Sequence, residues 1–140
     1  MTTKDLFLRI MHRQTKIALA TSTYSQPNVR VVNFYYDEQE NRLYFATIDK
    51  NDKIREFDIN PKVAFTTLPC EGIEHVRARG VVKKSRKSFY DIEEAFLEKM
   101  PDYAELAKKS MDELSLFEIE FQSALVFRGF DDIDILEIED

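Results

Sequence analysis

Residues 16–47 read KIALATSTYSQPNVRVVNFYYDEQENRLYFAT, and this stretch alternates between strand-forming and turn-forming composition. Residues 16–21, 29–36 and 42–47 are rich in β-branched, aromatic and small apolar side chains, which favour strands. The intervening segments YSQP and DEQEN have compositions typical of turns. We therefore predict an antiparallel meander in which the 29–36 strand pairs with the 42–47 strand.

The rest of the chain continues this pattern of short strands, interrupted by helices. Strands are predicted at 63–68, 73–82, 117–121, 125–130 and 133–135. One helix is predicted to begin after Thr3 as N-cap and another to span 51–59. A third is predicted to begin at a capping box formed by Ser88 and Asp91, and a single helical turn is predicted at 103–107. When many short strands form a barrel, each strand buries one face and few strand edges stay exposed to solvent. The sequence thus predicts a mainly β fold, a Greek-key-like antiparallel barrel with a few helices.

The strand predicted at 73–82 shows the alternation most clearly. Val76, Ala78, Gly80 and Val82 fall on one face, whereas His75, Arg77, Arg79 and Val81 fall on the other. Successive side chains of a strand point to opposite sides, so the first set is expected in the core. The two arginines are expected either in solvent or paired with the acidic end of the chain.

Composition bounds the class of protein. A chain of 140 residues, 44% of them hydrophobic, fits one globular domain over 1–140. The net charge of −6 arises mainly in residues 131–140, which hold six acids and no base. The basic run at 83–87 reads as a solvated strand end, so no nucleic-acid partner is expected. The sequence has no long apolar segment of the kind that forms a membrane span or a signal peptide. We therefore expect a cytoplasmic protein.

One strand-to-helix junction combines residue types that suit an anion. The strand ending at Thr47 leads to a helix predicted to begin near Asn51, where backbone N–H groups are free. The ammonium of Lys53 or Lys50 and the guanidinium of Arg30 could reach the same anion. These residues together predict a phosphate site.

The segments PNVRVVN at 27–33, LYFAT at 43–47 and NDK at 51–53 resemble a known family pattern. They are similar to the FMN-binding split-barrel superfamily of pyridoxamine 5′-phosphate oxidase and its short general-stress and nitroimidazole-resistance relatives. The resemblance implies that Arg30 and Lys53 bind the FMN phosphate with help from the Thr47 hydroxyl. It also implies that backbone groups around Val31, Val32 and Asn33 face the isoalloxazine ring, in a cleft between the subunits of a homodimer.

The activity implied by this resemblance is electron transfer from a nicotinamide donor through FMN to a small organic acceptor. Phe34, Tyr35 and Tyr36 occupy the stretch where true pyridoxamine phosphate oxidases carry a lysine, so a B6 phosphate is not the expected substrate. No residue is assigned a catalytic role.

Alternatives remain open at this point. In such a dimer, Arg77 and Arg79 could instead lie beside the flavin of the second subunit. The protein could be a flavin-binding stress protein without turnover, or a haem protein with His12 or His75 as axial ligand. No metal site is expected, because Cys70 and His75 lack further converging ligands. Cys70 has no nearby base to activate it as a nucleophile.

Overall fold

The computed structural model describes residues 1–48, 53–105, 108 and 114–138. Its elements, in chain order, are α1 Thr3–Arg13, β1 Lys16–Thr23, β2 Gln26–Asn33, β3 Tyr35–Asp37, β4 Arg42–Ile48, α2 Lys53–Ile59, β5 Lys62–Thr67, β6 His75–Lys84, α3 Phe89–Lys99, the 3-10 turn η1 Pro101–Tyr103, β7 Leu114–Glu120, β8 Ser123–Phe127 and β9 Ile133–Glu137.

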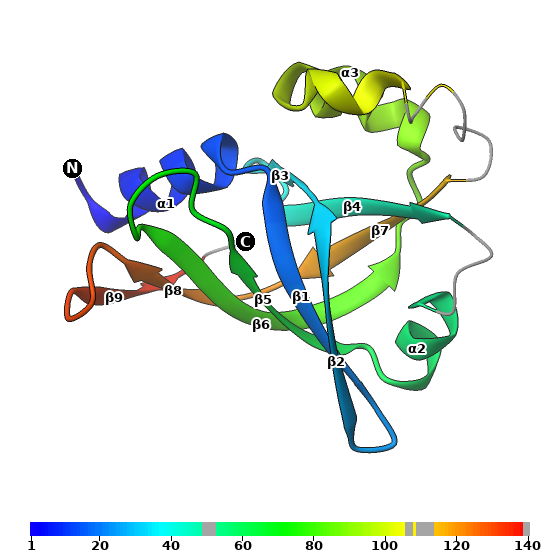
Figure 1. Cartoon of the computed structure of the whole chain (residues 1–140), viewed down its shortest axis with the longest axis horizontal. Helices are drawn as coiled ribbons and strands as arrows, with labels where there is room; N and C mark the ends of the chain where they lie inside the picture. The colour runs from blue at the N-terminus through cyan, green and yellow to red at the C-terminus, as the bar shows by residue number, and fades with distance from the viewer. Residues whose placement is uncertain (49–52, 106–107, 109–113, 139–140) are drawn as a thin grey trace.

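The described strands form one antiparallel sheet in the order β2-β1-β5-β6-β7-β4-β3, with β8 and β9 attached beside β6 (Figure 1). The long β6 has two partners along one edge: its first residues pair with β8 and its last residues with β7. The sheet rolls into a barrel but is not closed, since β2 and β3 remain at the two ends of this order. The predicted mainly β barrel is confirmed.

The predicted pairing of the second and third strands is wrong. Residues 29–36 do not form one strand, because the chain bends at Phe34, which is fully buried. The Phe34 backbone N–H donates to the Thr15 carbonyl at 3.0 Å. β2 therefore pairs with β1, and only the short β3 pairs with β4, whose other partner is β7. β2 and β4 come into contact without a described backbone ladder.

Helices close the two ends of the barrel core and cover one outer surface (Figure 1). α1 buries its apolar face against the core, and Phe57 of α2 packs edge-on against Phe45 and Phe117 at the opposite end. α3 covers the outer side of β4 and β7, where Phe89, Ile92 and Phe96 pack over Tyr44 and Leu116. β4 is consequently buried on both faces.

Local sequence signals account for several element boundaries. The alternation predicted for residues 75–82 is confirmed, with Val76, Ala78 and Val82 buried. The predicted Ser88–Asp91 capping box is also confirmed, since the Asp91 carboxylate accepts from the Ser88 N–H at 2.8 Å. The first helix begins one residue earlier than predicted, because Thr2 and not Thr3 is its N-cap.

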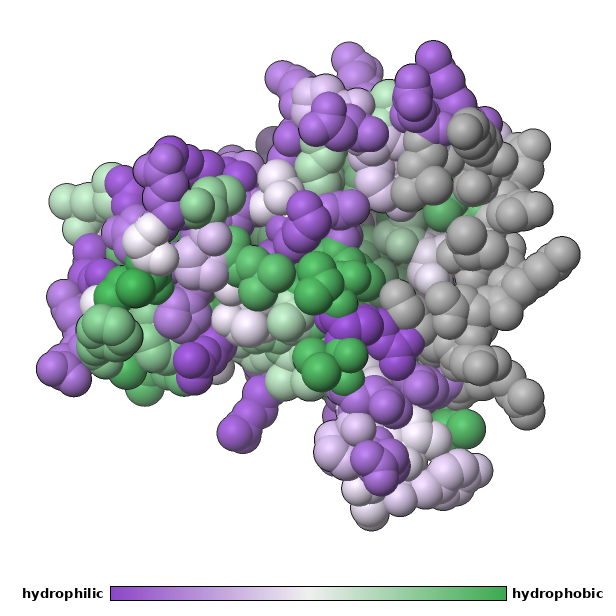
Figure 2. All heavy atoms as spheres, viewed as in Figure 1, coloured by the Kyte–Doolittle hydropathy of each residue, from purple (hydrophilic) through white to green (hydrophobic). Residues whose placement is uncertain are grey.

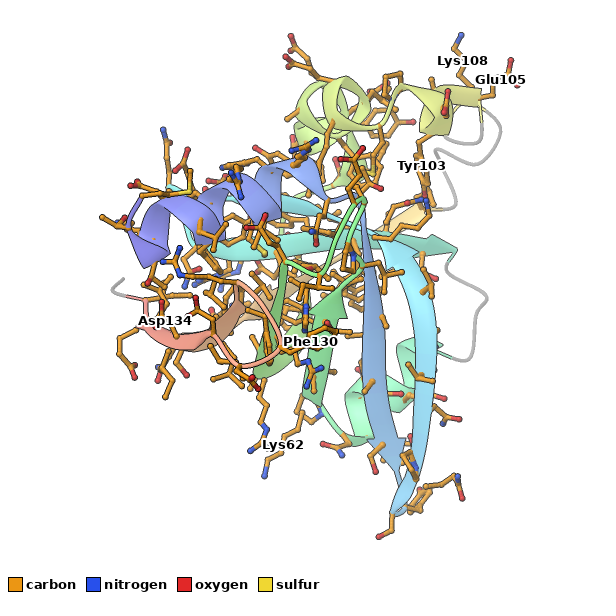
Figure 3. All side chains as sticks on the ribbon, turned by 60° about the vertical axis from the view of Figure 1, so that its left-hand side comes forward. Lys62, Tyr103, Glu105, Lys108, Phe130 and Asp134 are labelled. Carbon is orange, nitrogen blue, oxygen red and sulfur yellow. The ribbon has the colours of Figure 1, made fainter. Side chains whose placement is uncertain are left out.

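The β8–β9 hairpin is fastened to the start of α1 by polar contacts. The Thr3 hydroxyl donates to the Asp134 carboxylate at 2.8 Å, and Arg128 Nε donates to the same carboxylate at 3.2 Å. These hydrogen bonds lower the pKa of Asp134. Figure 3 shows Asp134 beside α1 and Phe130 at the turn of the hairpin. Among the described strands β9 pairs with β8 alone, as expected for an acidic edge strand.

Gly80 lies on β6 between the segments that pair with β8 and β7, and the backbones approach closely there. A Cβ built at Gly80 would lie 2.3 Å from the Glu120 carbonyl oxygen, which is backbone and cannot rotate away. Only glycine fits this position without a shift of β7.

We expect Gly80→Ala to lower the free energy of unfolding by about 2 kcal/mol, because the methyl group forces the two strands apart. Gly129→Ala is the matched control, since the nearest atom to its Cβ is 3.9 Å away. Urea denaturation of both variants measures the difference. Equal stability of the two would contradict the close approach.

Lys99 joins the end of α3 to two other parts of the molecule. Its ammonium group donates to the Met11 carbonyl in the last turn of α1 and to the Phe34 carbonyl, both at 3.0 Å. The same Nζ lies 3.7 Å from the centre of the Phe34 ring. Burial nevertheless dominates and lowers the pKa of Lys99 to about 7.

This pKa predicts a specific pH dependence of stability. Between about 7 and the ordinary value of 10.5, the unfolded chain binds a proton at Lys99 that the folded chain does not. The free energy of unfolding should therefore rise with pH in this window, by about 1 kcal/mol for each pH unit. Below pH 7 the proton is bound in both states and the dependence disappears.

Comparing the wild type with Lys99→Met, which cannot titrate, isolates the effect. The stability difference between the two should shift in favour of the wild type between pH 7 and 9.5, as measured by chemical denaturation. Lys84→Met, at an exposed lysine, serves as control and should show no such trend. A constant difference between wild type and Lys99→Met would contradict the lowered pKa.

Candidate cofactor site

Arg30 is held by a network of side chains from different elements. Its Nη2 donates to Glu56 Oε2 of α2 at 2.5 Å, and Thr21 Oγ1 of β1 donates to the same oxygen at 3.2 Å. The Arg30 and Glu56 side chains are only 19% and 20% exposed, so this ion pair is partly shielded from water. Arg30, which the sequence predicts to bind a phosphate, therefore lies against a carboxylate of the protein itself.

Thr47 lies near the end of β4, on the strand face that also carries Phe45. It is buried, and Phe45 contacts Phe57 of α2. α2 thus links β4 to the network around Arg30, because its Glu56 and Phe57 are adjacent in sequence. The helix predicted at 51–59 is described from Lys53 to Ile59, whereas the junction itself and the predicted start near Asn51 lie outside the described residues.

The remaining cations and the cap of the predicted phosphate site fall largely beyond the described structure. Lys50 and Asn51 lie outside the described residues. Lys53 is the first residue of α2, and its side chain also lies outside what the structure describes. Their predicted roles toward the phosphate remain predictions.

The predicted ring-binding segment divides between the two faces of β2. Arg30 and Val32 share the side that meets the core, where Val32 is 9% exposed, whereas Val31 is 56% exposed on the opposite side with Asn33. β2 pairs with β1 only, so backbone groups on its other edge have no strand partner among the described residues. An edge of this kind can offer N–H and C=O groups to a planar ligand.

A broad, largely apolar surface lies on the side of the sheet that none of the described helices covers. We call it the outer face: the outward side chains of β2, β1, β5, β6, β8 and β9, namely Val29, Val31, Ala18, Ala20, Ala64, Thr66, Arg77, Arg79, Leu125 and Ile135. Figure 2 shows hydrophobic side chains gathered over β1, β2 and their neighbours, and again toward β8 and β9.

The middle of the outer face is hollow because its residues there are small. Ala18, Ala20 and Ala64 lie side by side on adjacent strands and form the floor of a groove of about 610 Å³. Val29 and Ile135, each 70% exposed, stand on either side of it. Exposed apolar side chains that cluster on one face in this way are a feature of interaction sites.

The arginines of the outer face have different surroundings. The Arg77 guanidinium lies 4.6 Å from the centre of the Phe127 ring, and Arg79 is exposed at the wall of the groove. Within the described part of the chain, no ion pair connects either arginine to the acidic C-terminal segment. The basic run at 83–87 is instead neutralised in part, since Lys83 pairs with Glu118 and Glu120, and Lys87 pairs with Glu40.

The histidines and the cysteine have the following surroundings. His12 Nε2 is 3.6 Å from Glu38, whereas the His75 ring stacks on Phe127 with its Nδ1 2.7 Å from the Ile73 carbonyl. Cys70 is exposed. In the described ranges, no group of three or more His, Cys, Asp and Glu side chains could hold a metal ion. None of the helices described here has the length and apolarity needed to cross a bilayer.

Sequence reasoning missed Glu56, which pairs with the predicted arginine, and Thr21, which donates to Glu56. The role of Glu56 could not be recognised from the sequence, because an acid on a short amphipathic helix ordinarily faces solvent. The outer face carried a signal that could have been used: Ala18 and Ala20 alternate with buried residues in β1, and small outward residues leave room for a ligand or partner.

Comparison with known proteins identifies a family whose sequence profile matches the chain and solved structures with a similar fold. A sequence profile described as pyridoxamine 5′-phosphate oxidase-like matches residues 10–132. No curated protein matches the sequence.

Solved structures share the fold at low identity. The General Stress Protein 26 from Bacillus anthracis str. Sterne is 15% identical, with a TM-score of 0.74 over 98% of this chain and 99% of that one. A heme binding protein from Mycobacterium smegmatis is 16% identical, with a TM-score of 0.77 over 98% of this chain and 58% of that one. A FAD-binding protein from Mesorhizobium loti is 14% identical, with a TM-score of 0.65 over 89% of this chain and 92% of that one.

Proposed function

The chain belongs to the pyridoxamine 5′-phosphate oxidase-like family, and from this we propose that it is a flavoprotein that binds FMN between the two subunits of a homodimer. The family and the FAD-binding structural neighbour support a flavin. The choice of FMN and its position rest on the residues around Arg30.

The observation that carries the proposal is the ion pair that Arg30 forms with Glu56. Its guanidinium already binds an oxyanion, the Glu56 carboxylate, in a partly shielded position supported by a hydroxyl from Thr21. A guanidinium is the side chain best suited to bind phosphate, because its N–H groups match the spacing of the phosphate oxygens. Arg30 would hold the FMN phosphate, with Thr47 and Lys53 as further contacts from β4 and α2.

The ring of the flavin would lie along the free edge of β2. Because β2 does not pair with β4, the backbone of residues 31–33 keeps hydrogen-bonding groups available on that side. When bound, the isoalloxazine would take electrons from a nicotinamide donor and deliver them to a small organic acceptor. This chain's own part is to bind the phosphate, orient the ring and exclude water from it.

The outer face supports a homodimer. Val29, Val31, Leu125 and Ile135 expose apolar surface that a monomer would leave in water. The small residues of the groove allow close approach of a second surface. A two-fold axis would pair this face with itself and produce equivalent flavin sites.

Removing Arg30 separates phosphate binding from ring binding. We expect Arg30→Met to weaken FMN binding by about 10- to 100-fold and to leave riboflavin binding nearly unchanged, because riboflavin lacks the phosphate. Quenching of flavin fluorescence measures both affinities. Arg13→Met, at an exposed arginine of α1, is the control and should change neither. If the wild type binds FMN and riboflavin equally, the phosphate site is wrong.

Charged substitutions on the outer face test the dimer. We expect Val31→Lys and Ile135→Lys to convert a dimer into a monomer, because both positions are exposed and tolerate lysine in the free chain. Sedimentation velocity reports the mass. Phe130→Lys, at an 86% exposed position in the β8–β9 turn, should leave the dimer intact. A wild type that sediments as a monomer at micromolar concentration would refute the proposed interface.

A stress protein that binds flavin without turnover remains distinct from an oxidoreductase. Anaerobic mixing of the FMN-loaded protein with NADH separates them by the rate at which the flavin absorbance is lost.

Haem binding is a second candidate, favoured by one observation. Since His75 Nδ1 faces the Ile73 carbonyl and must donate to it, its Nε2 carries the lone pair that binds iron. A Soret band that is lost in His75→Ala would support this candidate over the flavin.

A further inference from the structure

Glu56 occupies the donors that an incoming phosphate would use. Its Oε2 accepts hydrogen bonds from Arg30 Nη2 at 2.5 Å and from Thr21 Oγ1 at 3.2 Å. These donors come from β2 and β1, whereas the carboxylate comes from α2. Thr21 is buried, and about four fifths of the ion pair is shielded from solvent. The arrangement is a small oxyanion receptor filled by the protein's own side chain.

We expect the negative charge of Glu56 to affect phosphate binding at Arg30 more than the shape of its side chain does. It cancels the positive charge of Arg30 at short range, in surroundings where water and salt screen less than at an open surface. A phosphate that approached Arg30 while Glu56 stayed in place would bring negative charges close together. Phosphate and the Glu56 carboxylate therefore cannot both form close ion pairs with the Arg30 guanidinium.

We propose that Glu56 competes with the phosphate of FMN for Arg30 and thereby sets how strongly this protein prefers FMN to riboflavin. This inference rests on the proposed function and adds a specificity-determining residue to it. The carboxylate can leave by rotation of its own side chain, which is one-fifth exposed, while the buried Phe57 keeps α2 in place. FMN binding then includes the loss of the Arg30–Glu56 and Thr21–Glu56 contacts.

Substituting Glu56→Gln removes the charge but keeps an oxygen that can accept from Arg30. We expect this variant to bind FMN about 10-fold more tightly than the wild type and riboflavin equally well. Asp58→Asn makes the same change of charge at an exposed position on α2 and should leave both affinities unchanged. Flavin fluorescence titrations give the ratio of the two affinities for each protein.

The opposite role for Glu56, positioning Arg30 for the phosphate, predicts different results. In that case Glu56→Gln would leave the ratio unchanged or lower it, and the competition would be overturned. Glu56→Met provides a second variant without any hydrogen-bonding group. Competition predicts that it also favours FMN, whereas a positioning role predicts weaker FMN binding.

Inorganic phosphate keeps this test independent of flavin binding. If no protein in the series binds FMN or riboflavin, the proposed function fails, and thermal unfolding in phosphate or in chloride at equal ionic strength decides the role of Glu56. Competition predicts that phosphate raises the unfolding midpoint of Glu56→Gln more than that of the wild type. Equal shifts in the two proteins would overturn it.

Discussion

The buried bend at Phe34 is the constraint on which the rest of the arrangement depends. Its ring is inaccessible to solvent, its N–H donates to Thr15, and its carbonyl accepts from Lys99. These contacts separate β2 from β3, so that one strand joins β1 and the other joins β4. The barrel stays open between β2 and β4 as a consequence, and the strand that carries Arg30 keeps a free edge.

Much of the fold could be predicted from local patterns, because those patterns reflect contacts within one element. Alternation in residues 75–82 located the buried face of β6, and the Ser88–Asp91 box located the start of α3. The bend at Phe34 could not be predicted in this way, since it depends on Thr15 and Lys99, which are distant in sequence. An apolar run such as 29–36 reads as one strand unless its tertiary partners are known.

The candidate site shows the same limit. Arg30 was singled out from its residue type and a family resemblance, and the structure adds that it pairs with Glu56, which also accepts from Thr21. Single-sequence reasoning cannot show that an acid on α2 meets an arginine on β2, because the pairing depends on how the helix packs across the end of the barrel. The close approach at Gly80 was hidden for the same reason: the Glu120 carbonyl comes from another strand.

Charge and apolar surface complement each other in this account. The basic run at 83–87 is partly neutralised by acids of β7 and of the β3–β4 turn, whereas none of the described residues covers the apolar outer face. A partly shielded arginine, a free strand edge and an uncovered apolar face together suit an anionic, planar ligand at a subunit interface.

The most direct test of this account is the absorbance spectrum of the purified protein after incubation with FMN and removal of unbound flavin by gel filtration. The account predicts flavin bands at about one FMN per chain in a peak with the mass of a dimer. A colourless protein, or flavin that elutes entirely in the free fraction, would contradict the central claim and leave the open barrel without its proposed cofactor.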